Sequence, residues 1–346
     1  MFISRKSVLA TTLAATTALL CQSGAFAGPQ ADDHMKKGEE FYRKMKVKEA
    51  AEQYREVIRL DPKNAKAHQR LGAVLAAMDD YETAILESKQ AIKLDPKDYL
   101  AHVVLGQIYA NQSKMKEARV EFQQAVALNP KSFTGYMNLG LANTGLNNID
   151  DAIKAYSKAV ELKPEKAMAH HNLALVYQLK GDFPKAIEAA RKAVELAPKN
   201  PMPLLGLGNI YGDADKVEEA IKTYRDCLRM DDRNFLAHCG LGWMLEKKGD
   251  LEGALNEQKK ALKLAPDYSR ARYRMAAIFA AQGDQKKAEK EFKRCLETKS
   301  PDPMAFVEYG KFLQGNGRKN EARTQYEQAL KLSPDLKLAK DALAKL

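Results

Sequence analysis

Apolar and small residues recur along the chain with a period of 34 residues, and polar residues fill the positions between them. One alanine returns at this period nine times, without a single insertion. Most units also carry a glycine twelve positions before the alanine and a proline twelve positions after it. The alanines are Ala50, Ala84, Ala118, Ala152, Ala186, Ala220, Ala254, Ala288 and Ala322. Self-similarity at this period is typical of proteins built from stacked repeats.

Each 34-residue unit predicts two short helices. In residues 99–132 the apolar positions Leu105 and Tyr109, then Phe122 and Val126, fall at helical spacing. A turn such as Gly249-Asp250 separates the two halves of a unit, because Gly can end one helix in the left-handed conformation and Asp can cap the next. The chain is therefore predicted to be all-α, as a series of helical hairpins.

The units resemble the tetratricopeptide repeat (TPR). Its signature has an aromatic residue at position 4, Leu at 7, Gly at 8, Tyr at 11, Ala at 20, an aromatic residue at 24, Ala at 27 and Pro at 32. The unit at 99–132 matches it, apart from a histidine at position 4, with His102, Leu105, Gly106, Tyr109, Ala118, Phe122, Ala125 and Pro130. The resemblance implies a right-handed α-solenoid superhelix in which the first helices line a concave groove.

The domain boundaries follow from the period. A short linker covers residues 28–30, and residues 337–346 predict a C-terminal capping helix with an apolar stripe. Nine repeats are expected between them, at 31–64, 65–98, 99–132, 133–166, 167–200, 201–234, 235–268, 269–302 and 303–336.

Residues 1–27 are predicted to be a secretory signal peptide. Arg5 and Lys6 precede an apolar stretch, and Ala25-Phe26-Ala27 places small residues before a cut at Gly28. The apolar stretch is shorter than the ~20 residues that a membrane-spanning helix needs. Export is therefore expected, to the periplasm if the source has two membranes and to the exterior otherwise. A lipoprotein anchored through Cys21 is the alternative, and the rest of the sequence has no transmembrane run.

Candidate chemistry is sparse. Cys227, Cys239 and Cys295 remain after the predicted cut, an odd number that disfavours a disulfide framework, although Cys227 and Cys239 lie on consecutive helices and their pairing stays open. Five of the six histidines share repeat position 4, but such positions lie a hairpin apart, too far to share a metal ion. No catalytic motif, cofactor site or metal site is identified. We expect a protein that is not an enzyme.

The resemblance to the TPR family implies a set of partner-binding residues at groove positions. The first repeats offer Lys66 and Arg70, beside Lys36. The middle repeats offer apolar residues such as Val103, Val104, Met168 and Leu175. Two asparagines there, Asn138 and Asn172, resemble those that hold a peptide backbone in this family. The family also has a carboxylate clamp of five positions, which grips the C-terminal carboxylates of partner proteins. Asn209, Arg270 and Arg274 match three of these positions, and Leu205 and Gly240 stand at the two unmatched ones. The partner-binding candidates are Lys66, Arg70, Asn138, Asn172, Asn209, Trp243, Arg270 and Arg274.

The expected function is that of an exported, non-catalytic scaffold. It would bind an extended peptide or a protein partner in the groove and support assembly of an envelope or secretion complex. Two alternatives are a self-assembling homo-oligomeric platform and, because the formal net charge is +11, a binder of acidic polysaccharide. Nucleic acid is not expected as a partner outside the cytoplasm.

Overall fold

The computed structural model describes residues 28–298 and 301–346, and within these ranges the chain is all-α, with no strand. The predicted signal peptide and the alternative anchor at Cys21 lie outside the described residues. The chain divides into two compact units, with the boundary between Lys180 and Gly181. No described helix is long and apolar enough to cross a membrane.

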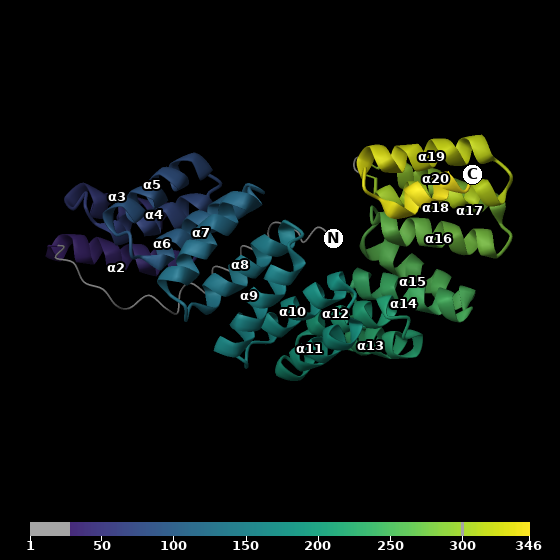
Figure 1. Ribbon diagram of the computed structural model, residues 1–346, viewed down its shortest axis with the longest axis horizontal. Helices are drawn as coiled ribbons and strands as arrows, with labels where there is room; N and C mark the ends of the chain where they lie inside the picture. Colours follow the sequence, from purple (N-terminus) through teal and green to yellow (C-terminus); the bar gives the residue numbers. More distant parts are fainter. Residues whose placement is uncertain (1–27, 299–300) are drawn as a thin grey trace. The chain divides into compact units, whose positions relative to one another are not determined.

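The first unit contains five first helices alternating with four second helices (Figure 1). They are α2 (Pro29–Arg43), α3 (Val47–Leu60), α4 (Ala65–Ala77), α5 (Tyr81–Leu94), α6 (Tyr99–Asn111), α7 (Met115–Leu128), α8 (Phe133–Gly145), α9 (Ile149–Leu162) and α10 (Ala167–Lys180).

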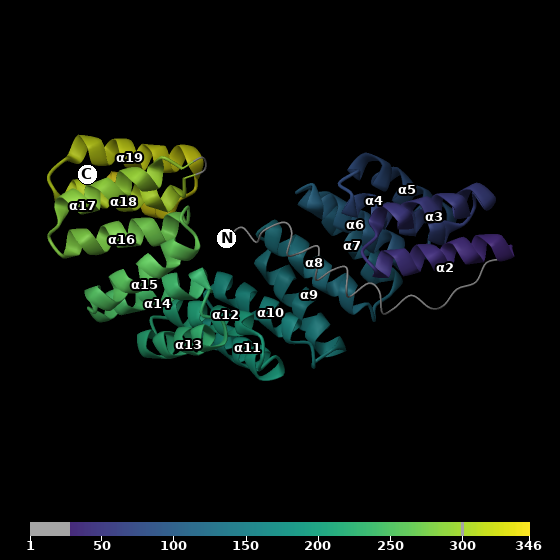
Figure 2. The same cartoon turned by 180° about the vertical axis from the view of Figure 1, so that it is seen from behind.

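The second unit begins with a second helix and ends with a short helix after the last pair (Figure 2). Its helices are α11 (Phe183–Leu196), α12 (Pro201–Asp213), α13 (Val217–Met230), α14 (Phe235–Lys248), α15 (Leu251–Leu264), α16 (Ser269–Ala281), α17 (Gln285–Leu296), α18 (Pro303–Gly315), α19 (Lys319–Leu332) and α20 (Lys337–Ala344).

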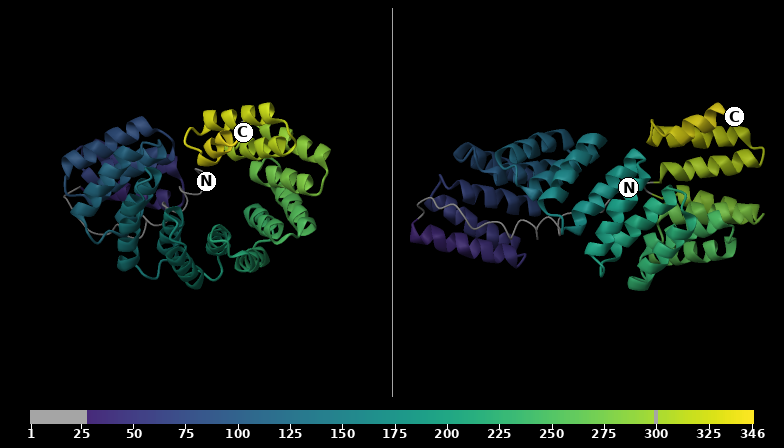
Figure 3. Two further views of the ribbon diagram at one scale, coloured as in Figure 1. Left: turned by 45° about the vertical axis from the view of Figure 1, so that its right-hand side comes forward. Right: turned by 60° about the horizontal axis from the view of Figure 1, so that its bottom comes forward.

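Helices pack in sequence order inside each unit. Each first helix packs on the second helix of its own pair, as α4 does on α5, and each second helix packs on the next first helix, as α13 does on α14. Successive first helices also touch, for example α4 with α6 and α16 with α18, and the two further views show the same succession (Figure 3). The predicted all-α fold of tandem helix pairs is confirmed.

The periodic alanines lie in the interior of the helix array. All nine have no exposed surface, since each lies where a second helix meets its first helix. Opposite them, the glycine at position 8 makes room for the large side chain at position 24. A Cβ built on Gly140 would lie 2.6 Å from the ring of Tyr156, and one on Gly106 would lie 2.5 Å from the ring of Phe122. Only glycine fits there without displacing the aromatic residue.

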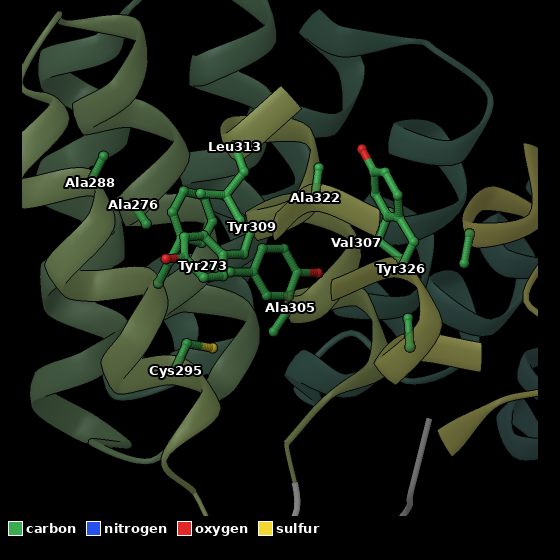
Figure 4. Close-up of a cluster of buried hydrophobic side chains, with 13 residues drawn as sticks. Tyr273, Ala276, Ala288, Cys295, Ala305, Val307, Tyr309, Leu313, Ala322 and Tyr326 are labelled. Carbon is green, nitrogen blue, oxygen red and sulfur yellow. The ribbon is translucent and has the colours of Figure 1, made fainter. Parts of the chain in front are cut away.

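The C-terminal end of the second unit shows how these small and large residues combine. Tyr273, Tyr309 and Tyr326 supply rings to one buried cluster, while alanines fill the narrow places between helices (Figure 4). Helix α20 adds the buried Ala339, and Leu336 and Leu343 pack partly buried on the same cluster. The last pair is thereby covered on its apolar side.

The turn inside each pair has one constant feature. The residue at repeat position 15 has a positive φ in all nine units. It is glycine at Gly181, Gly249, Gly283 and Gly317, as the Gly-Asp turns predict for the first three. The following Asp182, Asp250 and Asp284 each cap the next helix through a backbone N–H. In the other five units the same conformation is taken by Met45, Asp79, Ser113, Asn147 and Asp215.

Repeat position 4 forms a polar bridge that the sequence did not predict. His68 and His102 bond through Nδ1 to a glutamate nineteen residues later, Glu87 at 2.6 Å and Glu121 at 2.8 Å. His238 bonds Glu257 in the same way at 2.5 Å, and its Nε2 lies 3.0 Å from the carbonyl oxygen of Asp232. The bridge joins the two helices of a pair and the preceding repeat. These histidines therefore have a structural role.

Arg272 occupies the equivalent position in the next repeat and makes the equivalent bonds. Its guanidinium lies 3.1 Å from Glu291 and donates to the carbonyl oxygen of Pro266. The charge of Arg272 is therefore already paired within the fold.

Two glycines of helix α18, Gly310 and Gly315, test the close packing. Gly310→Ala should destabilise the chain by about 1–3 kcal/mol, because the added Cβ would overlap the ring of Tyr326. Gly315→Ala on the same helix meets nothing within 4 Å and should be neutral or stabilising by up to about 1 kcal/mol. Urea unfolding followed by circular dichroism would measure both, and equal midpoints would contradict the packing role of Gly310.

The bridge of His238 predicts a pH dependence of stability. Burial acts to lower the pKa of His238, but its bonds to Glu257 and to the Asp232 carbonyl outweigh this, so the pKa is raised. Stability from this group is complete below the unfolded pKa of histidine and is lost as pH rises through the folded pKa. Burial acts to raise the pKa of Glu257, yet the bonds from His238 and Lys260 lower it, so this contribution is lost towards acid.

We therefore expect wild type to lose stability relative to Glu257→Gln as pH rises from about 6 to 8, around the ordinary pKa of histidine. Urea unfolding followed by the fluorescence of Trp243, on the same helix α14 as His238, reports on this region. A stability difference that does not change over this pH interval would refute the role of the ion pair.

Candidate partner-binding surface

The candidate residues all lie on first helices, and the two units present them separately. In the first unit, Lys66 and Arg70 of α4 converge on one carboxylate of α2. The Lys66 Nζ and an Arg70 guanidinium nitrogen each lie 3.3 Å from Glu39 Oε1. The Arg70 side chain is 8% exposed. The predicted basic start of the groove is therefore largely neutralised within the fold, and among these residues Lys36 is the exposed cation without an ion pair to a described residue.

The two predicted asparagines have different surroundings. Asn172 on α10 is partly buried and hydrogen-bonds the side chain of Tyr156, which rises from α9. Asn138 on α8 is 5% exposed, and its Nδ2 finds no hydrogen-bond partner among the described residues. A buried N–H without an acceptor costs about 1–3 kcal/mol. Asn138 thus keeps an unused donor, whereas the amide of Asn172 is already engaged.

The predicted apolar lining of the first unit divides in the same way. Val103 and Val104 of α6 are buried and belong to the core, so the interpretation of these two as open pocket residues is wrong. Leu141 and Leu175 are partly buried, and Met168 is 51% exposed. The accessible apolar surface therefore lies on α8 and α10.

In the second unit, Trp243 of α14 is enclosed by cations. The guanidinium carbon of Arg274 on α16 lies 4.4 Å from the centre of its ring, and the Lys247 Nζ lies 5.0 Å from it. Arg274 also pairs with Glu246 at 3.3 Å. Burial raises the pKa of Glu246, although the charge of Arg274 opposes this. Trp243, Arg274 and Glu246 thus form one stacked, ion-paired group.

The other clamp candidates are only partly available. Asn209 on α12 accepts a hydrogen bond of 2.8 Å from the hydroxyl of Tyr224, whose ring packs over Gly240. Leu205 is buried. Arg270 on α16 is exposed and forms no ion pair with a described residue. Of the three matched residues, Asn209 and Arg274 already have partners within the fold, and Arg270 is the one without an ion pair to a described residue.

The remaining candidate chemistry is inert. Cys227, Cys239 and Cys295 are free and buried, and burial raises the pKa of each thiol to about 11. Cys227 and Cys295 each direct Sγ to a main-chain oxygen, of Pro201 and Ser269. No cluster of described residues could hold a metal ion.

Sequence reasoning missed the position-24 tyrosines as part of this surface. Their hydroxyl groups reach side chains of first helices, as Tyr224 reaches Asn209 and Tyr326 reaches Gln314 at 2.9 Å. The recurrence of an aromatic residue at position 24 was visible, but the signal for the polar end is only the choice of Tyr over Phe.

The stack on Trp243 predicts a fluorescence change. Arg274→Ala uncovers one face of the indole, so emission should move to longer wavelength and acrylamide quenching should increase. Lys287→Ala removes a cation from Phe279, 5.7 Å away from that ring, and serves as the matched control. Trp243 is the only tryptophan, so the signal is unambiguous. Identical quenching of Arg274→Ala and wild type would contradict the stack.

Two family models match the chain. The model of the cilia and flagella-associated protein 70 C-terminal domain matches residues 4–274, more than half of the chain. The tetratricopeptide repeat model matches residues 269–302 and 305–336. No curated protein sequence matches the chain.

Three solved structures show the same fold at low sequence identity. Yeast Tom70 has a TM-score of 0.53 and 19% identity, over 97% of this chain and 75% of Tom70. A tetratricopeptide repeat protein from Parabacteroides merdae has a TM-score of 0.50 and 16% identity, over 92% and 98%. A chain of the APC/C Cut9–Hcn1 hetero-tetramer has a TM-score of 0.54 and 16% identity, over 99% of this chain but only 60% of that one. With its family-model matches, its repeat signature and its tandem helix pairs, the chain belongs to the tetratricopeptide repeat family.

Proposed function

We propose that the chain is an exported, non-catalytic adaptor whose first helices bind extended peptide segments of partner proteins. The TPR fold is compatible with protein–protein interaction, and it presents side chains of successive first helices on one surface. Assembly of an envelope or secretion complex is the setting that an exported adaptor of this fold would serve. In this function the surfaces of the two units are separate binding sites.

The observation that carries the proposal is the unused donor of Asn138. Its Nδ2 is buried on α8 without a partner among the described residues. Rotation of the Asn138 side chain would bring this donor, which has almost no exposed surface, to a main-chain carbonyl of a bound peptide, independently of the peptide's sequence. The accessible apolar residues Leu141 and Met168 lie on the same and the following first helix. They would contact side chains of that peptide.

The second unit offers a charge-selective surface. Arg270 is exposed with no ion pair, and its planar guanidinium suits a carboxylate. Trp243 and Arg274 stack beside each other on α14 and α16. An acidic side chain or a C-terminal carboxylate of a partner is the group that we propose for Arg270.

The test is selection from a displayed library of random peptides. Wild type, Asn138→Ala and Arg270→Ala serve as the targets that capture them. Asn138→Ala should weaken the binding of the enriched peptides about tenfold, because one buried hydrogen bond is lost. Arg270→Ala should abolish any preference for acidic residues. The control is Asn256→Ala, the same change on the exposed outer side of α15. The proposal fails if wild type enriches no peptide, or if Asn138→Ala and Asn256→Ala bind alike.

A further inference from the structure

The second helices carry a separate surface that the proposed function does not use. In α13, repeat positions 20, 24 and 27 hold Ala220, Tyr224 and Cys227, and all three are fully buried. Positions 18, 22, 25 and 29 are spaced by four, three and four residues, so they form one stripe on the opposite side of the helix. We call this the outer stripe. It faces away from the packed side of each second helix.

Cations dominate the outer stripe of α13, α15 and α17, the three successive second helices in the middle of the second unit (Figure 1). Six of these cations are exposed and form no ion pair with a described residue. They are Lys222, Arg225, Lys259, Lys263, Lys286 and Lys290.

Acidic groups do not neutralise this set. Of the stripe's three glutamates, Glu218 is already paired with Lys248 of α14 at 2.8 Å, which leaves Glu252 and Glu297. Two further stripe cations, Arg229 and Lys293, have acidic partners on their own helices. The six free cations thus outnumber the free acids of the stripe, and the excess remains as an uncompensated positive surface.

The neighbouring helices limit the surface. On α11 the stripe holds Glu188 and Glu195, and its Arg191 donates to the hydroxyl of Tyr211. On α19 it holds Glu327 with the uncharged Asn320 and Thr324, and Lys331 is its one cation. In the first unit the corresponding stripe also has cations, but the exposed Leu86 and Val120 interrupt it.

We propose that the outer stripe of α13, α15 and α17 binds a linear carboxylated polysaccharide. Two of the six cations lie on each helix and the pair returns in every repeat, so a ligand that satisfies them must be extended and must repeat its negative charge. No aromatic residue of these three helices is exposed, and base stacking is what single-stranded nucleic acid requires. The stripe also has no large apolar residue for insertion into a membrane. A soluble, regularly charged sugar polymer fits both constraints.

This inference does not depend on the proposed function, because it uses different residues on the other layer of helices. The probe is polygalacturonate, with uncharged dextran of matched length as its control. Binding to the purified full chain would be measured by calorimetry at several salt concentrations. Affinity for polygalacturonate should fall steeply with salt, as expected for released counterions, and dextran should not bind.

The variant replaces Lys222, Arg225, Lys259 and Lys263 by glutamine. The matched control replaces Lys63, Lys97, Lys131 and Lys199, four exposed lysines between repeats that also form no ion pair with a described residue. Both variants lose the same net charge. The stripe variant should bind polygalacturonate about tenfold more weakly, and the control variant should bind like wild type.

Three results would overturn the inference. Equal weakening of both variants would show that net charge alone attracts the polymer. Equal binding of dextran, or no binding of polygalacturonate, would exclude a site for acidic sugars. Tighter binding of single-stranded DNA or of phosphatidylglycerol vesicles, lost in the stripe variant, would assign the surface to another class of polyanion. Circular dichroism would verify that both variants keep the wild-type helix content.

Discussion

The fold depends on one recurring contact, in which the large side chain at repeat position 24 lies directly against the glycine at position 8. It appears as Gly38 with Tyr54, Gly140 with Tyr156 and Gly208 with Tyr224, and each glycine has no room for a Cβ. The contact fixes how closely the two helices of a pair approach. Because each second helix then meets the next first helix, the spacing of one pair sets the position of its neighbour within a unit.

The same contact accounts for the polar surface of the first helices. A tyrosine that packs its ring on the glycine extends its hydroxyl group beyond the glycine. There the hydroxyl of Tyr224 donates a hydrogen bond to Asn209, and that of Tyr326 donates one to Gln314. Where the large ring is missing, the space is filled by smaller polar groups, as Ser88 does beside Gly72 and Gln258 beside Gly242. Packing in the interior therefore decides which polar groups on the surface are already occupied.

The sequence predicted the fold well because the fold is encoded in residue size. Position 20 is always alanine and position 8 is always glycine or alanine, so the strict period makes both visible in the sequence. The partners of polar side chains were harder to predict. His68 and Glu87, for example, lie on different helices, and their bond becomes visible only when the two helices are placed side by side. Arg70 was expected to offer its charge to a partner for this reason, although a carboxylate lies 3.3 Å from it.

The candidate site was predictable only as a set of positions. Groove positions follow from the resemblance to the TPR family, but occupancy does not. Asn138 and Asn172 share position 6, yet one amide has an unused donor and the other binds Tyr156. Arg270 and Arg274 lie one helical turn apart, and only the second finds Glu246 and Trp243. These differences arise from the neighbouring helix, which a single repeat does not specify.

The residue in the left-handed conformation in the turn inside each pair makes the repeats differ in stability. Glycine adopts this conformation freely, whereas a residue with a Cβ pays roughly 1–2 kcal/mol for it, less for Asn and Asp. Glycine serves four of the five turns from Gly181 onward, with Asp215 in the other, whereas the first four turns have Met45, Asp79, Ser113 and Asn147. In a chain whose stability is a sum over repeats and their interfaces, this concentrates conformational strain in the N-terminal pairs. Those pairs are where the array should open first, which leaves the C-terminal repeats as its more persistent part.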